Sequence, residues 1–325
     1  MHPAFSVIFL TTLIGAGQGL FLALFTAQSY AAFNLLPQPD AHAFYARGSA
    51  LAMILLVLGL AASFFHLGHP ERAWRAAAQW RTSWLSREVI VLPAFMGTVG
   101  LYGVAHWLDF RPTLMTLPSG LPVDPTAILG VAGTVLAFAL FLCTAMIYAC
   151  LKFLREWHTP LTVANYVLLG GASGFTLAAA FADSAAPELV GFFAGWALII
   201  TGLALIGRTL SLARNARIKS PSTLQTAIGV KHPHIVQKAQ GFMGGSFNTR
   251  EFFHGRSVAA LRSVKWFFLI ATFFIPAILL LAAVGGASSA LVPAVLVQYL
   301  GLLAERWFFF AQANHPQNLY YQSIA

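Results

Sequence analysis

Long apolar runs, rather than alternating apolar and polar positions, dominate this chain. A helix that crosses the hydrocarbon core of a bilayer needs about 20 mostly apolar residues. Eight runs reach that length, at about residues 4–33, 46–66, 88–108, 126–151, 162–182, 187–208, 264–285 and 288–310. The pattern predicts an all-α integral membrane protein, in which an eight-transmembrane-helix bundle forms one polytopic domain over residues 1–325.

The connections between these runs are short, except for the sixth, at about residues 209–263. Its Gly and Pro residues favour irregular structure. Its basic and aromatic residues, among them Arg250 and Phe252, are typical of a surface that binds another protein. We expect this connection to dock on a partner subunit, with a flexible loop as the alternative.

Basic residues are distributed unevenly between the two sides of the predicted bundle. Connections 2, 4 and 6 hold four, two and ten of the 19 Lys and Arg residues, whereas the odd-numbered connections hold only Arg47 and Arg111. Lys and Arg concentrate in the cytoplasmic connections of membrane proteins. We therefore predict that both termini and the even-numbered connections face the cytoplasm, in the bacterial inner membrane.

Composition supports a membrane protein and excludes several other classes. The chain is 58% apolar and 9% charged, against about 25% charged residues in soluble domains. A soluble enzyme, a disordered chain and a nucleic-acid-binding domain are thereby excluded, and the net charge of +9 reflects topology. Cys143 and Cys150 lie about 10 Å apart along one predicted helix, too far to form a disulfide with each other.

Ionisable residues gather at one edge of the predicted bundle, in ASFFHLGHPERAWRAAAQWRTSWLSREVI at residues 62–90. His66 closes the second predicted helix and Glu88 opens the third, so antiparallel neighbours would bring both groups to the same edge. An imidazole beside a carboxylate can hydrogen-bond a quinone carbonyl and transfer the protons that quinone reduction consumes. In the structural alternative, His66 caps the end of its helix, and the Glu88 carboxylate is stabilised by the dipole at the N-terminus of the third helix.

Two further groups reach the same edge. Glu305 and Arg306 are adjacent late in the last predicted helix, and adjacent helical residues do not face each other. We therefore expect no ion pair between them, and expect Arg306 to approach Glu88. Tyr148 lies near the end of the fourth predicted helix, at a similar depth.

The first predicted helix carries polar and small residues near its middle, in GAGQG. Gly15 and Gly19 form a pattern of small residues four apart, which favours close helix packing. Gln18 lies near the centre of the membrane, where we expect it to hydrogen-bond a neighbouring helix.

Tryptophan and arginine alternate in the second connection. Trp74, Trp80 and Trp84 are interleaved with Arg72, Arg75 and Arg81. Such rings and guanidinium groups are typical of the head-group level of a membrane. We also expect the three arginines to help dock a partner subunit.

Other cofactor chemistry finds little support in the sequence. A b-type haem needs two histidines that face each other across the bundle. No predicted helix holds a histidine with an obvious partner at the same depth, so we expect no haem. Ligation by His66 and His158 is the one alternative. No metal-ligand motif such as CxxC or HExxH is found. A b-haem cytochrome subunit and a secondary transporter remain alternatives, although polar groups clustered at one edge disfavour transport.

HLGHPERAW followed by WLSREV resembles the HLG-x-P…LS-x-E signature of the membrane-anchor subunits of dimethyl sulfoxide reductase-type molybdoenzymes. The eight-helix layout is similar over essentially the whole chain. The resemblance implies a haem-free, non-catalytic anchor that exchanges electrons with a quinone, either ubiquinone or menaquinone. It implies two partners, an iron–sulfur electron-transfer subunit and a molybdopterin catalytic subunit. It also implies that His66 and Glu88, with Arg306 and Tyr148, bind the quinone.

The direction of electron flow depends on the side that the partners occupy. The predicted cytoplasmic edge and the stretch GFMGGSFNTREFFHG at 241–255 resemble the anchor of the cytoplasm-facing sulfite dehydrogenase branch. That resemblance implies electron transfer from sulfite to quinone. The alternative is a menaquinol-oxidising anchor of a dimethyl sulfoxide reductase-like complex.

Overall fold

The structure is a computed structural model that describes residues 1–118, 122–220, 222–239 and 250–321. Within those residues, eight helical spans are long and apolar enough to cross a membrane, as the sequence predicts. They are α1 (Phe5–Ala32), α2 (Arg47–Phe64) after the π-helix η1 (Ala41–Ala46), α3 (Trp84–Trp107), α4 (Pro125–Ala149), α5 (Pro160–Ala185), α6 (Val190–Asn215) after the 3-10 turn η3 (Pro187–Leu189), the continuous run of α9 (Val258–Leu269), η5 (Ile270–Phe274) and α10 (Ile275–Val284), and α11 (Leu291–Ala311) after η6 (Ser288–Ala290).

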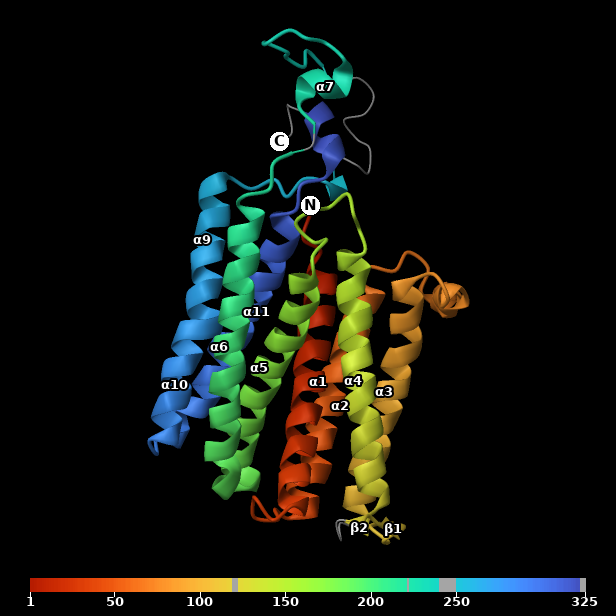
Figure 1. Cartoon of the computed structure of the whole chain (residues 1–325), viewed down its shortest axis with the longest axis vertical. Helices are drawn as coiled ribbons and strands as arrows, with labels where there is room; N and C mark the ends of the chain where they lie inside the picture. Colours follow the sequence, from red (N-terminus) through yellow and green to blue (C-terminus); the bar gives the residue numbers. More distant parts are fainter. Residues whose placement is uncertain (119–121, 221, 240–249, 322–325) are drawn as a thin grey trace.

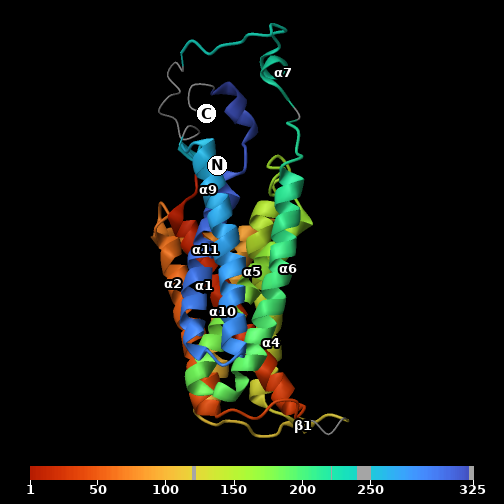
Figure 2. The ribbon, with the colours of Figure 1, turned by 90° about the vertical axis from the view of Figure 1, so that its left-hand side faces the viewer.

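The helices run side by side along the long axis of the molecule (Figures 1 and 2). One end holds both chain termini and α7 (Leu224–Ile228), and we call it the terminus side. The other end, the hairpin side, holds the antiparallel strands β1 (Met115–Thr116) and β2 (Pro122–Val123). The 3-10 helices η2 (Pro70–Gln79) and η7 (Pro316–Tyr320) belong to the terminus side.

Apolar side chains cover the outside of the bundle. Ile54, Val135, Ile206 and Leu296 are each more than half exposed. In a bilayer these side chains contact lipid, while the helices satisfy their own backbone hydrogen bonds. The outer surface therefore fits a membrane-spanning bundle.

Helices α1 and α5 form the centre of the bundle. In these two helices 61% and 67% of the apolar window is buried, against 28–39% in the other six spans. The two helices cross where their glycines meet: a Cβ on Gly19 would lie 2.1 Å from the Gly170 carbonyl oxygen, and one on Gly174 would lie 2.0 Å from the Gly19 carbonyl carbon. This confirms the close packing predicted for Gly15 and Gly19, because only glycine fits at so short a separation.

We expect Gly174→Ala to destabilise the bundle by about 1–3 kcal/mol or more, because the added methyl group collides with the backbone of α1. Gly195→Ala is the matched control, since a Cβ there has no neighbouring atom within 4 Å. Thermal unfolding of the two variants in detergent measures the difference. Equal unfolding temperatures would contradict the close α1–α5 contact.

Three helix boundaries differ from the sequence prediction by about four residues or more. Helix α3 begins at Trp84 instead of 88. Helix α6 continues to Asn215 instead of ending near 208, and the seventh span begins at Val258 instead of 264. The side chain of Ser257 accepts a hydrogen bond from the Ala260 amide and so starts α9 early. The predicted boundaries were placed where the apolar residues end. A helix can continue past the hydrocarbon core, because long basic side chains on its last turns reach into water.

The described part of the sixth connection packs on the C-terminal segment. The ring of Phe252 stacks on His315 with centroids 3.7 Å apart, and its carbonyl accepts a hydrogen bond from the Asn318 amide. The Met1 ammonium group donates to the Ala313 carbonyl oxygen at 2.7 Å. The Phe252 ring predicted for docking is thus engaged within the chain, while Arg250 stays exposed. Residues 241–249 of the GFMGGSFNTREFFHG stretch lie outside the described residues.

Candidate functional site

Helices α1, α3, α4, α5 and α11 enclose a small polar chamber in the half of the bundle nearest the terminus side. Its volume is about 30 Å³, enough for roughly one or two water molecules. The polar residues that line it are Thr11, Thr12, Gln18, Glu88, Thr144, Tyr166, Ser173 and Arg306. So many polar side chains in the interior of a membrane protein are costly, and they mark a candidate functional site.

Glu88 enters the chamber from the first turns of α3. Ser83 caps this helix by accepting a hydrogen bond from the Ser86 amide, which fixes where α3 begins. The Glu88 side chain is buried, and its Oε1 accepts a hydrogen bond from Thr144 Oγ1 at 2.5 Å. No ion pair involves Glu88 within the described chain. A carboxyl group with one neutral partner beside a water-sized space can bind and release protons.

Gln18 lies at the deep end of the chamber. Its Nε2 donates a hydrogen bond to the Ala137 carbonyl oxygen of α4 at 2.8 Å. This confirms the predicted interhelical hydrogen bond near the middle of the membrane. The remaining side-chain oxygen gives the chamber a further polar atom.

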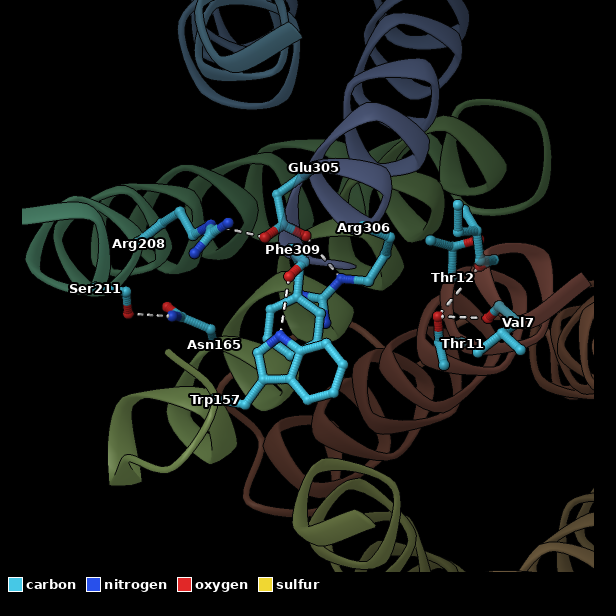
Figure 3. Close-up of polar contacts among 11 residues, drawn as sticks. Val7, Thr11, Thr12, Trp157, Asn165, Arg208, Ser211, Glu305, Arg306 and Phe309 are labelled. Atoms are coloured by element: carbon cyan, nitrogen blue, oxygen red, sulfur yellow. Dashed lines mark hydrogen bonds and ion pairs between the residues drawn. The ribbon is translucent and has the colours of Figure 1, made fainter. Parts of the chain in front are cut away.

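A buried ionic cluster lies beside the chamber, formed by Arg208 of α6 and by Glu305 and Arg306 of α11 (Figure 3). The Glu305 carboxylate receives Arg208 Nε at 2.7 Å on one oxygen and Arg306 Nε at 2.7 Å on the other. All three side chains are almost fully buried. The Arg306 guanidinium also lies 4.1 Å from the ring centroid of Tyr166, a cation–π contact.

The prediction that Glu305 and Arg306 do not pair is wrong, because Arg306 Nε lies 2.7 Å from Glu305 Oε2. Adjacent side chains leave a helix in different directions, but an arginine is long enough to fold back. In a buried interior of low dielectric constant, the pairing of opposite charges outweighs that local preference. Arg306 does reach the chamber that Glu88 lines, without forming an ion pair with it.

A second, smaller polar cavity continues from the chamber toward the terminus side. Arg306 and Tyr166 line both cavities, and the second is also lined by Glu305, Asn165 and Glu156. Glu156 lies in the connection between α4 and α5, at the terminus-side surface. The polar residues therefore form a series from the buried Glu88 carboxyl to the aqueous side of the bundle.

His66 lies outside this chamber. It follows the end of α2, its side chain is exposed, and it is absent from the residues that line the cavity. Partial burial lowers the pKa of its imidazole below the ordinary value of 6.5. At neutral pH the ring is therefore uncharged, with one nitrogen that donates and one that accepts a hydrogen bond.

Tyr148 is also outside the chamber, in an aromatic cluster. Its ring centroid lies 5.3 Å from that of Trp157, 5.5 Å from Phe309 and 5.4 Å from Phe310. The indole nitrogen of Trp157 donates to the Phe309 carbonyl oxygen at 2.9 Å and holds the α4–α5 connection on α11 (Figure 3). Tyr166, and not Tyr148, is the tyrosine that lines the chamber.

Among the polar residues that line the chamber, sequence reasoning singled out only Gln18, Glu88 and Arg306. The residues that it missed include Thr144 and Tyr166, and Arg208 of the ionic cluster. Arg208 had a usable signal, because an arginine at the edge of an apolar run can belong to the helix and face the interior. Thr144 and Tyr166 had none, since a single Thr or Tyr in an apolar helix is common and its direction depends on the packing of neighbouring helices.

The basic residues predicted for docking lie on the exposed surface of the terminus side. Arg75 and Arg81 lie over the rings of Trp74 and Trp80, at 5.5 and 5.4 Å from the ring centroids. Trp74 is 72% exposed. Exposed aromatic rings flanked by guanidinium groups suit both head groups and a protein partner.

Metal-ligating side chains and thiols form no second cluster in the part of the chain that the structure describes. Among the described residues, no three His, Cys, Asp or Glu side chains gather as a metal site requires. His158 Nδ1 lies 2.6 Å from the Ala149 carbonyl oxygen and is engaged with the backbone. Cys143 and Cys150 are both free thiols, as their spacing predicts.

Comparison with known proteins agrees with the membrane bundle. Residues 1–311 match the family described as DMSO reductase anchor subunit (DmsC). The chain is also 59% identical, over 326 aligned residues and the full length of both chains, to the sulfite dehydrogenase C subunit of Allochromatium vinosum.

Proposed function

The chain belongs to the family of DMSO reductase anchor subunits and is a membrane anchor subunit of a complex of that type, and on this premise we propose its part in electron transfer. It binds a membrane quinone near Glu88 and passes to that quinone the electrons released by sulfite oxidation. Catalytic molybdopterin and iron–sulfur partner subunits dock on the terminus side and supply the redox chemistry. The anchor itself oxidises no substrate.

One observation carries this proposal: the buried Glu88 carboxyl, which opens on a water-sized chamber and is followed by polar residues to the terminus side. Reduction of a quinone to a quinol takes up two electrons and two protons. The electrons come from the partner subunits, and the protons need a route from water into the bilayer. Glu88, Arg306 and the polar residues of the second cavity provide groups for such a route.

The quinone ring binds at the rim of the chamber rather than inside it, because about 30 Å³ is too small for a ring. Helices α2 and α3 pack against each other. His66 follows the terminus-side end of α2, and Glu88 lies near the same end of α3. The neutral His66 ring donates a hydrogen bond to one quinone oxygen, and the Glu88 carboxyl delivers a proton through the chamber.

Two observations favour sulfite as the electron source and the cytoplasm as the location of the partners. The relative from the sulfite dehydrogenase of Allochromatium vinosum is identical at 59% of positions over the full length. The basic residues gather in the even-numbered connections, which lie on the terminus side with the chain ends. Under the positive-inside rule that side faces the cytoplasm.

Deletion of this chain tests the proposed function. We expect the catalytic subunits to be released from the membrane. They should still oxidise sulfite with an artificial soluble acceptor, but should no longer reduce quinone. Membranes and soluble fractions of the deletion strain are assayed with both acceptors, and the re-expressed chain is the control. Quinone reduction that persists without the chain would contradict the proposal.

Reporter fusions test the proposed orientation. We expect a C-terminal fluorescent protein that matures only in the cytoplasm to be bright, and a C-terminal alkaline phosphatase, active only outside it, to be inactive. A fusion at Glu188, in the η3 turn between α5 and α6 on the hairpin side, should give the opposite pair of results. An active phosphatase at the C-terminus would reverse the orientation.

A further inference from the structure

A larger cavity lies at the opposite end of the bundle, next to the β1–β2 hairpin. Its volume is about 680 Å³, within the range of about 300–1,000 Å³ typical of ligand pockets. Helices α1, α3 and α4 form it together with the segments around the hairpin. The polar residues that line it are Gln28, Ser29, Gln38, Tyr45, His106, Arg111 and Asp124.

Two buried polar side chains in this cavity are without a partner. His106 is 1% exposed and Tyr45 is 2% exposed. Among the described residues, neither ring nitrogen of His106 nor the Tyr45 hydroxyl has a hydrogen-bond partner. The imidazole is held between the rings of Tyr45 and Tyr102, each with its centroid 4.6 Å away. Unpaired buried groups of this kind cost free energy, so they indicate a ligand that completes the hydrogen bonds.

The charges around the cavity favour an uncharged head group. Arg111 forms an ion pair with Asp109. Asp124 adds a carboxylate, whose Oδ1 accepts hydrogen bonds from Thr126 Oγ1 and the Ala127 amide. With the histidine neutral, these three ionised side chains carry a net charge of −1, from one arginine and two aspartates. An anionic phosphate head group would be repelled here.

The apolar side of the cavity faces the lipid. Ile128 and Val131 of α4 line it and are 49% and 56% exposed on the outer surface of the bundle. A membrane-soluble molecule can therefore enter sideways from the bilayer and leave its chain among these apolar residues. Its head group then reaches the His106 imidazole and the Tyr45 hydroxyl.

We propose that this cavity is a second binding site for a membrane quinone or quinol, with His106 and Tyr45 hydrogen-bonded to its ring oxygens. A neutral imidazole has one donor and one acceptor, and a phenol hydroxyl has both roles, so the two residues match either redox form. The walls are mostly apolar with a few convergent polar groups, as in small-molecule sites generally.

The site binds a quinone without reducing it. Glu88 and His106 are eighteen residues apart on α3, which corresponds to a rise of about 27 Å. The buried rings of Phe21 and Phe95 pack against each other between the two levels, with Phe21 also against Tyr102. This apolar layer separates the cavity from the chamber, so the cavity holds carrier molecules apart from the electron donor.

Photolabelling of the whole purified complex tests the proposal. The probe is an azido-quinone with a short isoprenoid chain, in vesicles of phosphatidylethanolamine and phosphatidylglycerol. We expect label on peptides that contain Tyr45, His106 or Ile128, and its loss by at least tenfold in His106→Phe, which keeps an aromatic ring but removes both ring nitrogens. Tyr45→Phe, which keeps the ring stack, should weaken labelling by about fivefold to tenfold through one lost hydrogen bond.

The matched control is His42→Gln, because His42 is an exposed histidine on the same side that packs on Trp107 outside the cavity. It should label as the unaltered complex does, and all variants should retain sulfite-to-quinone turnover within about twofold. Excess unlabelled quinone should displace the probe, whereas excess phosphatidylglycerol should not. Label that survives both His106→Phe and Tyr45→Phe, or that only the phospholipid displaces, would overturn the proposal. If label were missing only from peptides near Glu88, the result would contradict the quinone site proposed there and would still support the site at His106 and Tyr45.

Discussion

Glu88→Gln is expected to lower sulfite-to-quinone turnover by about 100-fold or more, the usual contribution of a positioned proton-transfer group. The amide fills the same space and can keep a hydrogen bond with Thr144, but it can neither bind nor release a proton. Sulfite oxidation with an artificial soluble acceptor should be unchanged, because that acceptor takes its electrons from the partner subunits. Steady-state assays of the purified complex with the two acceptors measure the contrast.

Two further variants separate proton transfer from folding at this position. Glu88→Asp keeps a carboxyl group and should restore part of the turnover. Glu71→Gln removes a carboxylate at an exposed ion pair with Arg72 and should leave both activities unchanged. Equal loss of activity with both acceptors in Glu88→Gln would show that the residue supports assembly instead.

Glu305→Gln is expected to destabilise the bundle by about 3–5 kcal/mol, the cost of breaking a buried ion pair from one side. The carboxylate lies between two buried guanidinium groups, and its loss leaves two positive charges without compensation in the membrane interior. Thermal unfolding in detergent and the amount of chain that accumulates in the membrane measure the effect.

The sign of the charges can be tested within the same cluster. Arg208→Met leaves the Glu305–Arg306 pair balanced, so it should destabilise the protein less than Glu305→Gln does. Glu71→Gln, on the surface, should change stability by no more than about 1 kcal/mol. If Arg208→Met destabilised the protein as much as Glu305→Gln does, the destabilisation would come from lost packing and not from uncompensated charge.

The eight membrane spans were predictable because an apolar run of the right length is a local property of the sequence. The same holds for Gly15 and Gly19, whose spacing predicts close packing. Their partners on α5, Gly170 and Gly174, were not predictable, because four-residue spacings of small residues do not specify which helices meet. The Gln18 hydrogen bond was predicted, but its acceptor on α4 was not.

The candidate site was predictable only in part. Glu88 was found from its position at the end of an apolar run, and it does line a polar chamber. The chamber itself depends on how five helices pack, and so does the choice of Tyr166 over Tyr148. The rule that adjacent helical residues do not pair failed for Glu305 and Arg306, because it describes solvated helices and not a buried cluster. The shared role of His66 and Glu88 in quinone binding stays a prediction.

Proton exchange between the Glu88 carboxyl and a quinone at the rim of the chamber can be observed directly. Infrared difference spectra of the purified complex are recorded between the oxidised and reduced forms of the bound quinone. We expect a carboxyl C=O band that changes with the redox state of the quinone, shifts in ²H₂O and disappears in Glu88→Gln but not in Glu71→Gln. A quinone signal accompanied by no carboxyl band, or by one that persists in Glu88→Gln, would contradict this role of Glu88.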